Sequence, residues 1–389
     1  MQVRAILAVV VLGTLVAACG SGTSSPTGPA TMNVRLVDAP SSGYQEVNVD
    51  VRRVEIASDG GWIVLGTPNR VVNLLALTGG VSDTLVDGAT LPAGRYGQMR
   101  LVLGPDNSVK LLDGTVAPLK VPSGQQSGVK LIVNFDVRPG TTADVYIDFD
   151  AHRSVFVHEA GASGKYILRP TVRAFDRLET GSISGTFTVA GTLAPLPGAV
   201  VTAQTVTAGT PAVVRSTITD AAGRYVLDLL PRDGTYFVVS QPVTYDTAGL
   251  VTGSYEPRAS AGLAITATTP VRTFDASFTL AAVTGGIAGA IAPVALENQA
   301  DSVDARLPLD AGGVLQSFIV RNVSASVTPA GETYAIPALP ATAPSRAYTV
   351  VATRKSVDSA GGETFVTTSP KTADVAPGAP TTADIAFAP

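Results

Sequence analysis

The sequence predicts an all-β protein made of tandem antiparallel β-sandwiches. Val and Thr recur in short runs, and no long stretch shows the 3.6-residue apolar period of an amphipathic helix. The 39 glycines and 27 prolines among 389 residues indicate many turns. Hydrophobic residues make up 45% of the chain and charged residues 15%, which supports packed cores and argues against disorder. This length suggests two or three domains.

The N-terminus has the features of a lipoprotein signal peptide over residues 1–19. A basic start at Arg4 precedes the apolar stretch AILAVVVLGTLVAA, which is too short to span a membrane comfortably. LVAAC, which ends at Cys19, resembles a bacterial lipobox, although Val16 stands where Leu is usual. The resemblance implies cleavage before Cys19 and lipidation of this only cysteine, which would anchor the chain to a membrane. An ordinary signal peptide with an incidental cysteine is the alternative.

The following residues 20–31, GSGTSSPTGPAT, are predicted to form a flexible, uncharged tether. The tether would hold a folded body away from the membrane, so we expect the protein in the bacterial cell envelope. Gly20 rather than Asp follows the cysteine, which by resemblance to enterobacterial sorting favours the outer membrane. With Cys19 used as the anchor, the mature chain has no disulfide, and its fold must rest on burial alone.

A first module is expected over residues 32–178. MNVRLVDAP alternates apolar and polar residues from Met32 and then reaches a turn. In EVNVDVRRVEIAS the apolar residues change parity at Arg52 and Arg53, which predicts a β-bulge there. Only NRVVNLLAL is predicted to form a short helix. Further strands are expected in GWIVL, GRYGQMRLVL, VKLIVNFDV, ADVYIDFD, SVFVH and KYILRPTVRAF.

Five stretches of the first module carry a family resemblance. They are LVDAP, LPAGRYGQMRLVL, VPSGQQSGVKL, DFDAHRSV and YILRPTVR. In this order they resemble a family of bacterial lipoproteins whose N-terminal domain is of unknown function (DUF4382-type). The resemblance covers nearly the whole module and implies no known activity.

A second module is expected over residues 181–280. Asp220 and Gly223 suit a tight turn, and the alternation of Tyr225, Leu227 and Leu229 predicts a strand facing a core. A resemblance to carboxypeptidase-regulatory-like domains is carried by Gly185, Pro197, Gly198, Ala199, Thr219, Asp220, Gly223, Tyr225, Pro231, Gly234 and Tyr236. It implies a small sandwich of transthyretin-like or immunoglobulin-like type, without catalytic residues and with carbohydrate-binding relatives.

A third module, over residues 285–389, is predicted to be a divergent copy of the second. ITDAAGRYVLDLLP aligns without gaps with VTPAGETYAIPALP, and their starts at 218 and 327 differ by 109 positions. The same offset aligns FDASFTL with ADIAFAP. One offset that serves two separated strands indicates a repeat. The copy lacks the Pro-Gly-Ala turn of the second module.

The stretch DVYIDFDAHRSVFVHEAG holds both histidines of the chain, His152 and His158. As a strand it would place Asp148, Asp150 and His152 on one face, opposite an apolar face. We interpret this polar face as the solvated side of a half-buried strand. The alternatives are a metal site on these three residues, which needs ligands at close spacing, and a carboxylate pair for glycoside hydrolysis.

Other catalytic and nucleic-acid-binding signatures are missing from the sequence. GSISG has Ile183 where a nucleophile elbow has Ser, GASGKY lacks the spacing of a phosphate loop, and no H-E-x-x-H occurs. The net charge of −4 offers no basic face to nucleic acid. We therefore predict a non-enzymatic protein without a cofactor and without a nucleic-acid partner.

Three aromatic residues are candidates for a ligand platform. Trp62, the only tryptophan, follows a DGG turn, and we expect it to anchor the core, with a platform for a sugar ring as the alternative. Tyr245 and Tyr255 lie in the turn-rich stretch TYDTAGLVTGSYEP and are the other sugar-platform candidates.

Together these features predict a lipid-anchored envelope protein with a non-catalytic role in adhesion, scaffolding or ligand capture. Glycans or other envelope proteins are the expected partners besides the membrane. Carbohydrate binding through the sandwiches is the alternative function, and a metal-dependent enzyme that uses Asp148, Asp150 and His152 is the third.

Overall fold

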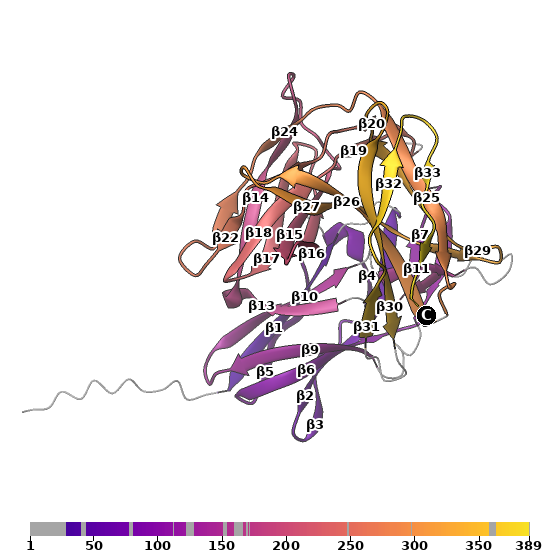
Figure 1. Cartoon of the computed structure of the whole chain (residues 1–389). Coiled ribbons are helices and arrows are strands. Elements are labelled where there is room, and N and C mark those ends of the chain that lie inside the picture. The colour runs from indigo at the N-terminus through magenta and orange to yellow at the C-terminus, as the bar shows by residue number, and fades with distance from the viewer. Residues whose placement is uncertain are drawn as a thin grey trace, which may run out of the picture.

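The computed structural model describes residues 29–39, 44–77, 81–111, 113–121, 128–150, 154–158, 166–168, 170, 172–246, 249–296, 298–357 and 363–388. These residues form β-strands, with short 3-10 helices at Leu74–Leu77 (η1) and Arg177–Glu179 (η2) (Figure 1). The predicted all-β class is confirmed. Among the described residues, no helix has the length and hydrophobicity needed to cross a bilayer.

The first module packs two sheets around one core. One sheet has the order β13-β10-β1-β5, with β1 parallel to β10. The other runs β12-β8-β7-β2-β6-β9, and β3 and β4 also pair with β2. The strands are β1 (Ala30–Ala39), β2 (Glu46–Ser58), β3 (Gly61–Gly66), β4 (Arg70–Asn73), β5 (Asp83–Leu91), β6 (Gly94–Leu103), β7 (Ser108–Lys110), β8 (Val116–Lys120), β9 (Val129–Val137), β10 (Thr142–Asp150), β11 (Val155–His158), β12 (Tyr166–Leu168) and β13 (Val172–Asp176).

Local features of the first module agree in part with the prediction. The pairing of β2 with β6 shifts by one residue between Val51 and Arg53, which confirms the predicted bulge. The predicted helix over NRVVNLLAL is half wrong, because Arg70–Asn73 pairs with β2 as strand β4. Two consecutive valines favour this extended conformation. Only Leu74–Leu77 is helical, as the 3-10 helix η1, and both of its end residues are buried.

The second module has two main sheets and a two-stranded sheet, β19-β20. One has the order β17-β14-β23, with β24 also on β14, and the other has the order β16-β15-β18-β21, with β22 also on β18. The strands are β14 (Thr180–Val189), β15 (Val200–Thr207), β16 (Thr210–Ile218), β17 (Arg224–Pro231), β18 (Gly234–Ser240), β19 (Val243–Tyr245), β20 (Val251–Ser254), β21 (Arg258–Ala259), β22 (Leu263–Ile265), β23 (Val271–Thr273) and β24 (Ala276–Phe278). Phe187, Tyr225 and Phe278 form an aromatic cluster in its core.

The third module pairs β33-β25-β29-β28 in one sheet and β27-β26-β30-β31 in the other. β34 also pairs with β25, and β32 with β30. The strands are β25 (Thr284–Ala292), β26 (Gln299–Asp310), β27 (Leu315–Ser324), β28 (Ser326–Thr328), β29 (Gly331–Pro340), β30 (Arg346–Val357), β31 (Glu363–Thr367), β32 (Lys371–Val375), β33 (Thr381–Thr382) and β34 (Ile385–Ala386).

The second and third modules repeat the same tyrosine contact. The Tyr225 hydroxyl donates to the backbone oxygen of Phe274 at 2.7 Å, and the Tyr334 hydroxyl donates to that of Ala383 at 2.5 Å. Donors and acceptors both differ by 109 positions, 334 minus 225 and 383 minus 274. Each tyrosine thereby ties one strand of its sheet to the segment that follows β23 or β33.

Two glycines explain how these segments come so close. A Cβ added to Gly185 in β14 would stand 1.9 Å from the backbone oxygen of Phe274, and one added to Gly289 in β25 would stand 2.5 Å from that of Ala383. Such a contact with a backbone atom cannot be relieved without moving the paired strand. The close parallel pairing therefore requires glycine at both places.

The modules also join one another directly. β11 of the first module pairs with β12 and, in parallel, with β28 of the third module, so one sheet continues between them (Figure 1). Between the second and third modules, the buried Gln204 amide donates to the backbone oxygen of Ile319 at 2.6 Å and accepts from its N–H at 3.0 Å. The rings of Phe237 and Phe318 pack there with centroids 5.2 Å apart.

Candidate functional site

Asp148 in β10 lies between the first and second modules. The apolar face of this strand is confirmed, because Val145, Ile147 and Phe149 are fully buried. The expectation that the opposite face is solvated is wrong for Asp148, which is only 6% exposed. The second module covers it, and its carboxylate forms an ion pair with Arg215 of β16.

Arg215 is held on several sides. Its Nε donates to the backbone oxygen of Asp228 at 3.0 Å, and its guanidinium lies 5.1 Å from the centroid of the Phe175 ring. Both side chains of the Asp148–Arg215 pair are 8% exposed. A buried charge is tolerated only when it is paired and hydrogen-bonded. Removal of either residue would therefore leave the other charge buried without a counter-ion.

A cleft opens beside this ion pair. Its lining comes from the first and second modules and consists of Val37, Asp38, Leu77, Tyr146, Arg215, Ser216, Thr217, Val226, Leu227, Asp228 and Leu229. Arg215 is engaged by Asp148, and Asp228 forms an ion pair with Arg177. Thr217 is buried, and its hydroxyl has no hydrogen-bond partner in the described part of the chain. The cleft thus offers a ligand the Thr217 hydroxyl beside the paired charges of Arg215 and Asp228.

The metal-site alternative rested on Asp148, Asp150 and His152. His152 and the side chain of Asp150 lie outside the described residues, as does Cys19. Asp148 already shares its carboxylate with Arg215. Across the residues that the structure describes, no three His, Cys, Asp or Glu side chains gather in a way that could hold a metal ion.

Trp62 is half-buried on the outer face of the sheet, and the expectation that it anchors the core is wrong. Trp62 pairs with Ala57 of β2. Ala57 and Glu55 point to the outer face of this sheet, whereas Val54 and Ile56 point into the core. The Arg100 guanidinium lies 4.2 Å from the centroid of the Trp62 ring. That arginine occupies one ring face, so a sugar has only the other face available.

The two tyrosine candidates differ in exposure. Tyr255 is buried in the core of the second module, so its role as a sugar platform is excluded. Tyr245 ends β19, is 44% exposed, and accepts a long hydrogen bond from Arg321 at 3.5 Å. Of the three aromatic candidates, Tyr245 presents the most open ring.

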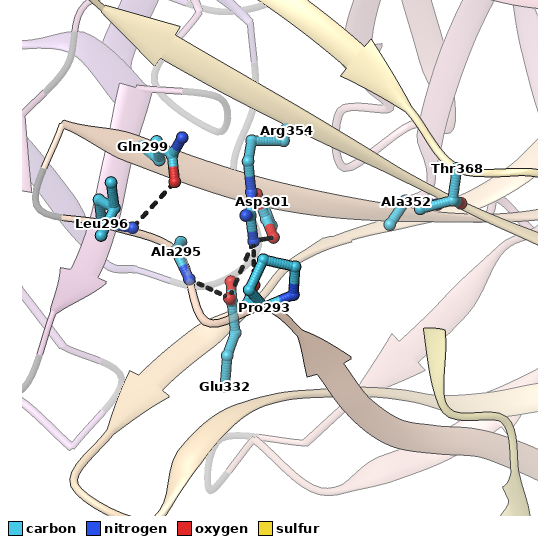
Figure 2. A network of polar contacts seen from close by, with 9 residues as sticks. All are labelled: Pro293, Ala295, Leu296, Gln299, Asp301, Glu332, Ala352, Arg354 and Thr368. Atoms are coloured by element: carbon cyan, nitrogen blue, oxygen red, sulfur yellow. Dashed lines mark hydrogen bonds and ion pairs between the residues drawn. The ribbon is translucent and has the colours of Figure 1, made fainter. Parts of the chain in front are cut away.

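Sequence reasoning missed a buried charge network in the third module (Figure 2). Arg354 of β30 donates to the two carboxylate oxygens of Asp301 in β26 at 2.8 and 2.6 Å and to the backbone oxygen of Pro293 at 2.7 Å. Glu332 of β29 lies 3.4 Å from the same guanidinium and accepts from the Ala295 N–H at 2.7 Å. All three charged residues are at least nine-tenths buried.

The network holds two carboxylates and one guanidinium, so one negative charge lacks a counter-ion within it. Burial, and after it the charge of Asp301, raise the pKa of Glu332 to about 7. The hydrogen bond from Ala295 and the charge of Arg354 lower this pKa by less. Asp301 and Arg354 stand opposite each other in the β26–β30 pairing. The sequence of the two strands does not predict this pairing register.

Replacement of Arg215 by Met should destabilise the protein by about 3–5 kcal/mol, because Asp148 is left buried without its counter-ion. Urea unfolding of the full chain measures the loss. The control is Arg70→Met, since the Arg70–Asp83 pair is half-exposed and should contribute less than about 1 kcal/mol. Equal effects of the two substitutions would contradict the structural role of the buried pair.

The raised pKa of Glu332 predicts a pH dependence of stability. The folded state binds this proton up to about pH 7, whereas the unfolded chain releases it near 4.5. Stability from this residue is therefore fully present below 4.5 and is lost as the pH rises to about 7, by a difference on the order of 3 kcal/mol. Urea unfolding of wild type and Glu332→Gln at pH 5 to 8 checks this, and parallel pH profiles of the two would refute it.

Comparisons with known proteins give one family match and several distant structural similarities. No curated protein sequence matches the chain. The Bacillus anthracis TIE protein is similar over 92% of this chain at 14% identity and a TM-score of 0.20, and this chain spans 50% of its length. A streptococcal ancillary pilin is similar over 92% of this chain and 99% of its own, at 11% identity and a TM-score of 0.20.

A third solved structure, the full-length major pilin SpaD from Corynebacterium diphtheriae, is similar over 51% of this chain and 67% of its own, at 14% identity and a TM-score of 0.19. Scores this low carry no argument about function. The family comparison is more specific, because it confirms the predicted domain of unknown function in the first module. Residues 29–170 match the family model of a domain of unknown function, DUF4382.

Proposed function

We propose that the chain is a lipid-anchored protein of the bacterial cell envelope whose three modules act as one non-catalytic scaffold for adhesion or ligand capture. The observation that carries the proposal is the set of buried contacts between modules. Each module contacts both of the others, so the body cannot hinge at one junction without breaking contacts at a second.

Three junctions support this view. The Asp148–Arg215 ion pair joins the first module to the second, and Gln204 joins the second to the third through two hydrogen bonds. Lys355 of the third module, itself buried, donates to the backbone oxygen of Pro170 at 3.3 Å, beside the β11–β28 pairing. Polar groups buried in this way fix orientation, because any displacement leaves a donor or acceptor unsatisfied.

The pairing of buried charges within the fold supports the proposal that the chain is non-catalytic. Asp148, Arg215, Asp301 and Arg354 are all engaged in ion pairs within the fold. We also propose that the second and third modules are carboxypeptidase-regulatory-like sandwiches, which the repeated tyrosine contact supports. The scaffold would be held at the outer membrane through Cys19, with envelope proteins or glycans as further partners.

Carbohydrate binding remains the second candidate, because the Tyr245 ring is 44% exposed at the end of a short hairpin. Exposed tyrosine rings stack on the apolar faces of sugars. Binding on a glycan array that Tyr245→Ala abolishes would support this function, and a lack of binding to any glycan would speak against it. The metal-dependent enzyme is not proposed, since Arg215 neutralises Asp148.

The anchor is tested by blocking its processing. In bacteria that produce the chain, globomycin should cause an uncleaved, lipidated precursor to accumulate, because the peptidase acts after lipid attachment to Cys19. A Cys19→Ala chain should carry no lipid and should stay uncleaved, because the peptidase needs the lipidated Cys19. Normal processing of the wild-type chain without lipid on Cys19 would refute the anchor.

A further inference from the structure

The outer face of the sheet β3-β2-β6-β9 carries exposed apolar side chains. Ile132 in β9 is 88% exposed and Val64 in β3 is 51% exposed, and the half-buried Trp62 lies two residues before Val64 on β3. The strand registers place Val64 opposite Glu55 of β2, and Ile132 opposite Gln98 of β6. In Figure 1 these strands lie together at the lower end of the molecule.

One part of the same face, around Glu55, Arg100 and Lys130, has an excess of positive charge. Arg100 stands opposite Glu55 on one side and Lys130 on the other, and Arg53 lies two residues from Glu55 on β2. Arg53 Nε approaches Glu55 Oε1 at 3.0 Å, and Arg100 pairs with the other oxygen of that carboxylate. Glu55 therefore pairs with two arginines, and Lys130 lies beyond Arg100 without a carboxylate opposite it. Further along β6 and β9, Arg95 stands opposite Asp136, so that end is balanced.

This combination differs from the average surface of the chain, whose net charge is −4. Trp prefers the boundary between hydrocarbon and headgroups, and isolated aliphatic side chains can enter it. Each Lys or Arg near an anionic bilayer strengthens binding by about fivefold. The pattern of one Trp, two exposed aliphatic residues and three cations on one face of a sheet thus matches an anionic lipid surface.

The tether places this module next to the bilayer. Eleven residue steps separate Cys19 from Ala30, where β1 begins. A fully extended segment of this length reaches at most about 40 Å, and a flexible Gly/Ser-rich one averages about 20 Å. Ala30 pairs with Leu91 at the end of β5, directly before β6 starts at Gly94. The anchored chain therefore enters the first module through the β13-β10-β1-β5 sheet, at the end where β5 leads into β6 of the sheet that carries the charged face.

We propose that this face, formed by Arg53, Trp62, Val64, Arg100, Lys130 and Ile132, docks onto anionic phospholipid headgroups. The inference rests on the proposed anchor at Cys19. Ile132, Val64 and the edge of Trp62 would sit among the headgroups, while Lys130 and the arginines contact phosphates. Docking would fix the orientation of the whole scaffold, since the modules move together.

Trp62 reports docking directly, because it is the only tryptophan of the chain. The lipidated full chain is reconstituted into phosphatidylethanolamine vesicles with or without phosphatidylglycerol, using lipids brominated near the headgroup. Trp62 fluorescence should lose most of its intensity only when phosphatidylglycerol is present, and high salt should restore it. Unquenched fluorescence in the anionic vesicles would overturn the proposal.

Matched variants separate docking from other effects. Ile132→Glu should abolish the quenching, whereas Leu315→Glu, a similarly exposed apolar site in the third module, should leave it unchanged. Equal quenching in both variants would overturn the proposal, and so would a change of oligomeric state in Ile132→Glu without a change in quenching. Vesicle flotation tests the anchor separately: a chain that floats but is not quenched refutes docking alone, and a chain that does not float refutes the anchor.

Discussion

The ion pair between Asp148 and Arg215 determines how the first two modules meet. Two opposite charges are removed from water at this junction, and each stabilises the fold only while the other stays in place. This requirement holds β10 against β16 and buries the polar face of a strand that would otherwise be solvated. It also fixes the cleft between the modules, because Arg215 forms part of the cleft wall.

The remaining junctions close the arrangement. Gln204 satisfies both its amide oxygen and its amide nitrogen with the backbone of Ile319, so the second and third modules have one favourable alignment. The β11–β28 pairing then returns the third module to the first through main-chain hydrogen bonds. A body closed in this way presents its outer faces in a constant geometry, as a scaffold requires.

Within each module, periodicity in the sequence was a reliable guide. The alternation of Val145, Ile147 and Phe149 and the bulge at Arg53 follow from the pattern of neighbouring residues. The 109-position offset in the sequence also relates Tyr225 to Tyr334, whose contacts the structure repeats. The burial of a strand's outer face depends on which other module packs against it. The burial of Asp148 therefore cannot be predicted from the sequence of β10. Asp301 and Arg354 meet through a strand register between segments 53 positions apart, which no local pattern reveals.

The aromatic candidates failed for a related reason. Trp62 and Tyr255 both lie next to turns, yet strand pairing places the first on an outer face and the second in a core. The central claim is that the three modules form one rigid body, and distances between spin labels test it most directly. In a Cys19→Ala chain, pairs of Cys residues replacing Val116, Leu193 and Leu315, one exposed site in each module, receive the labels. A narrow distance distribution for every pair is predicted; broad distributions between modules would contradict the claim.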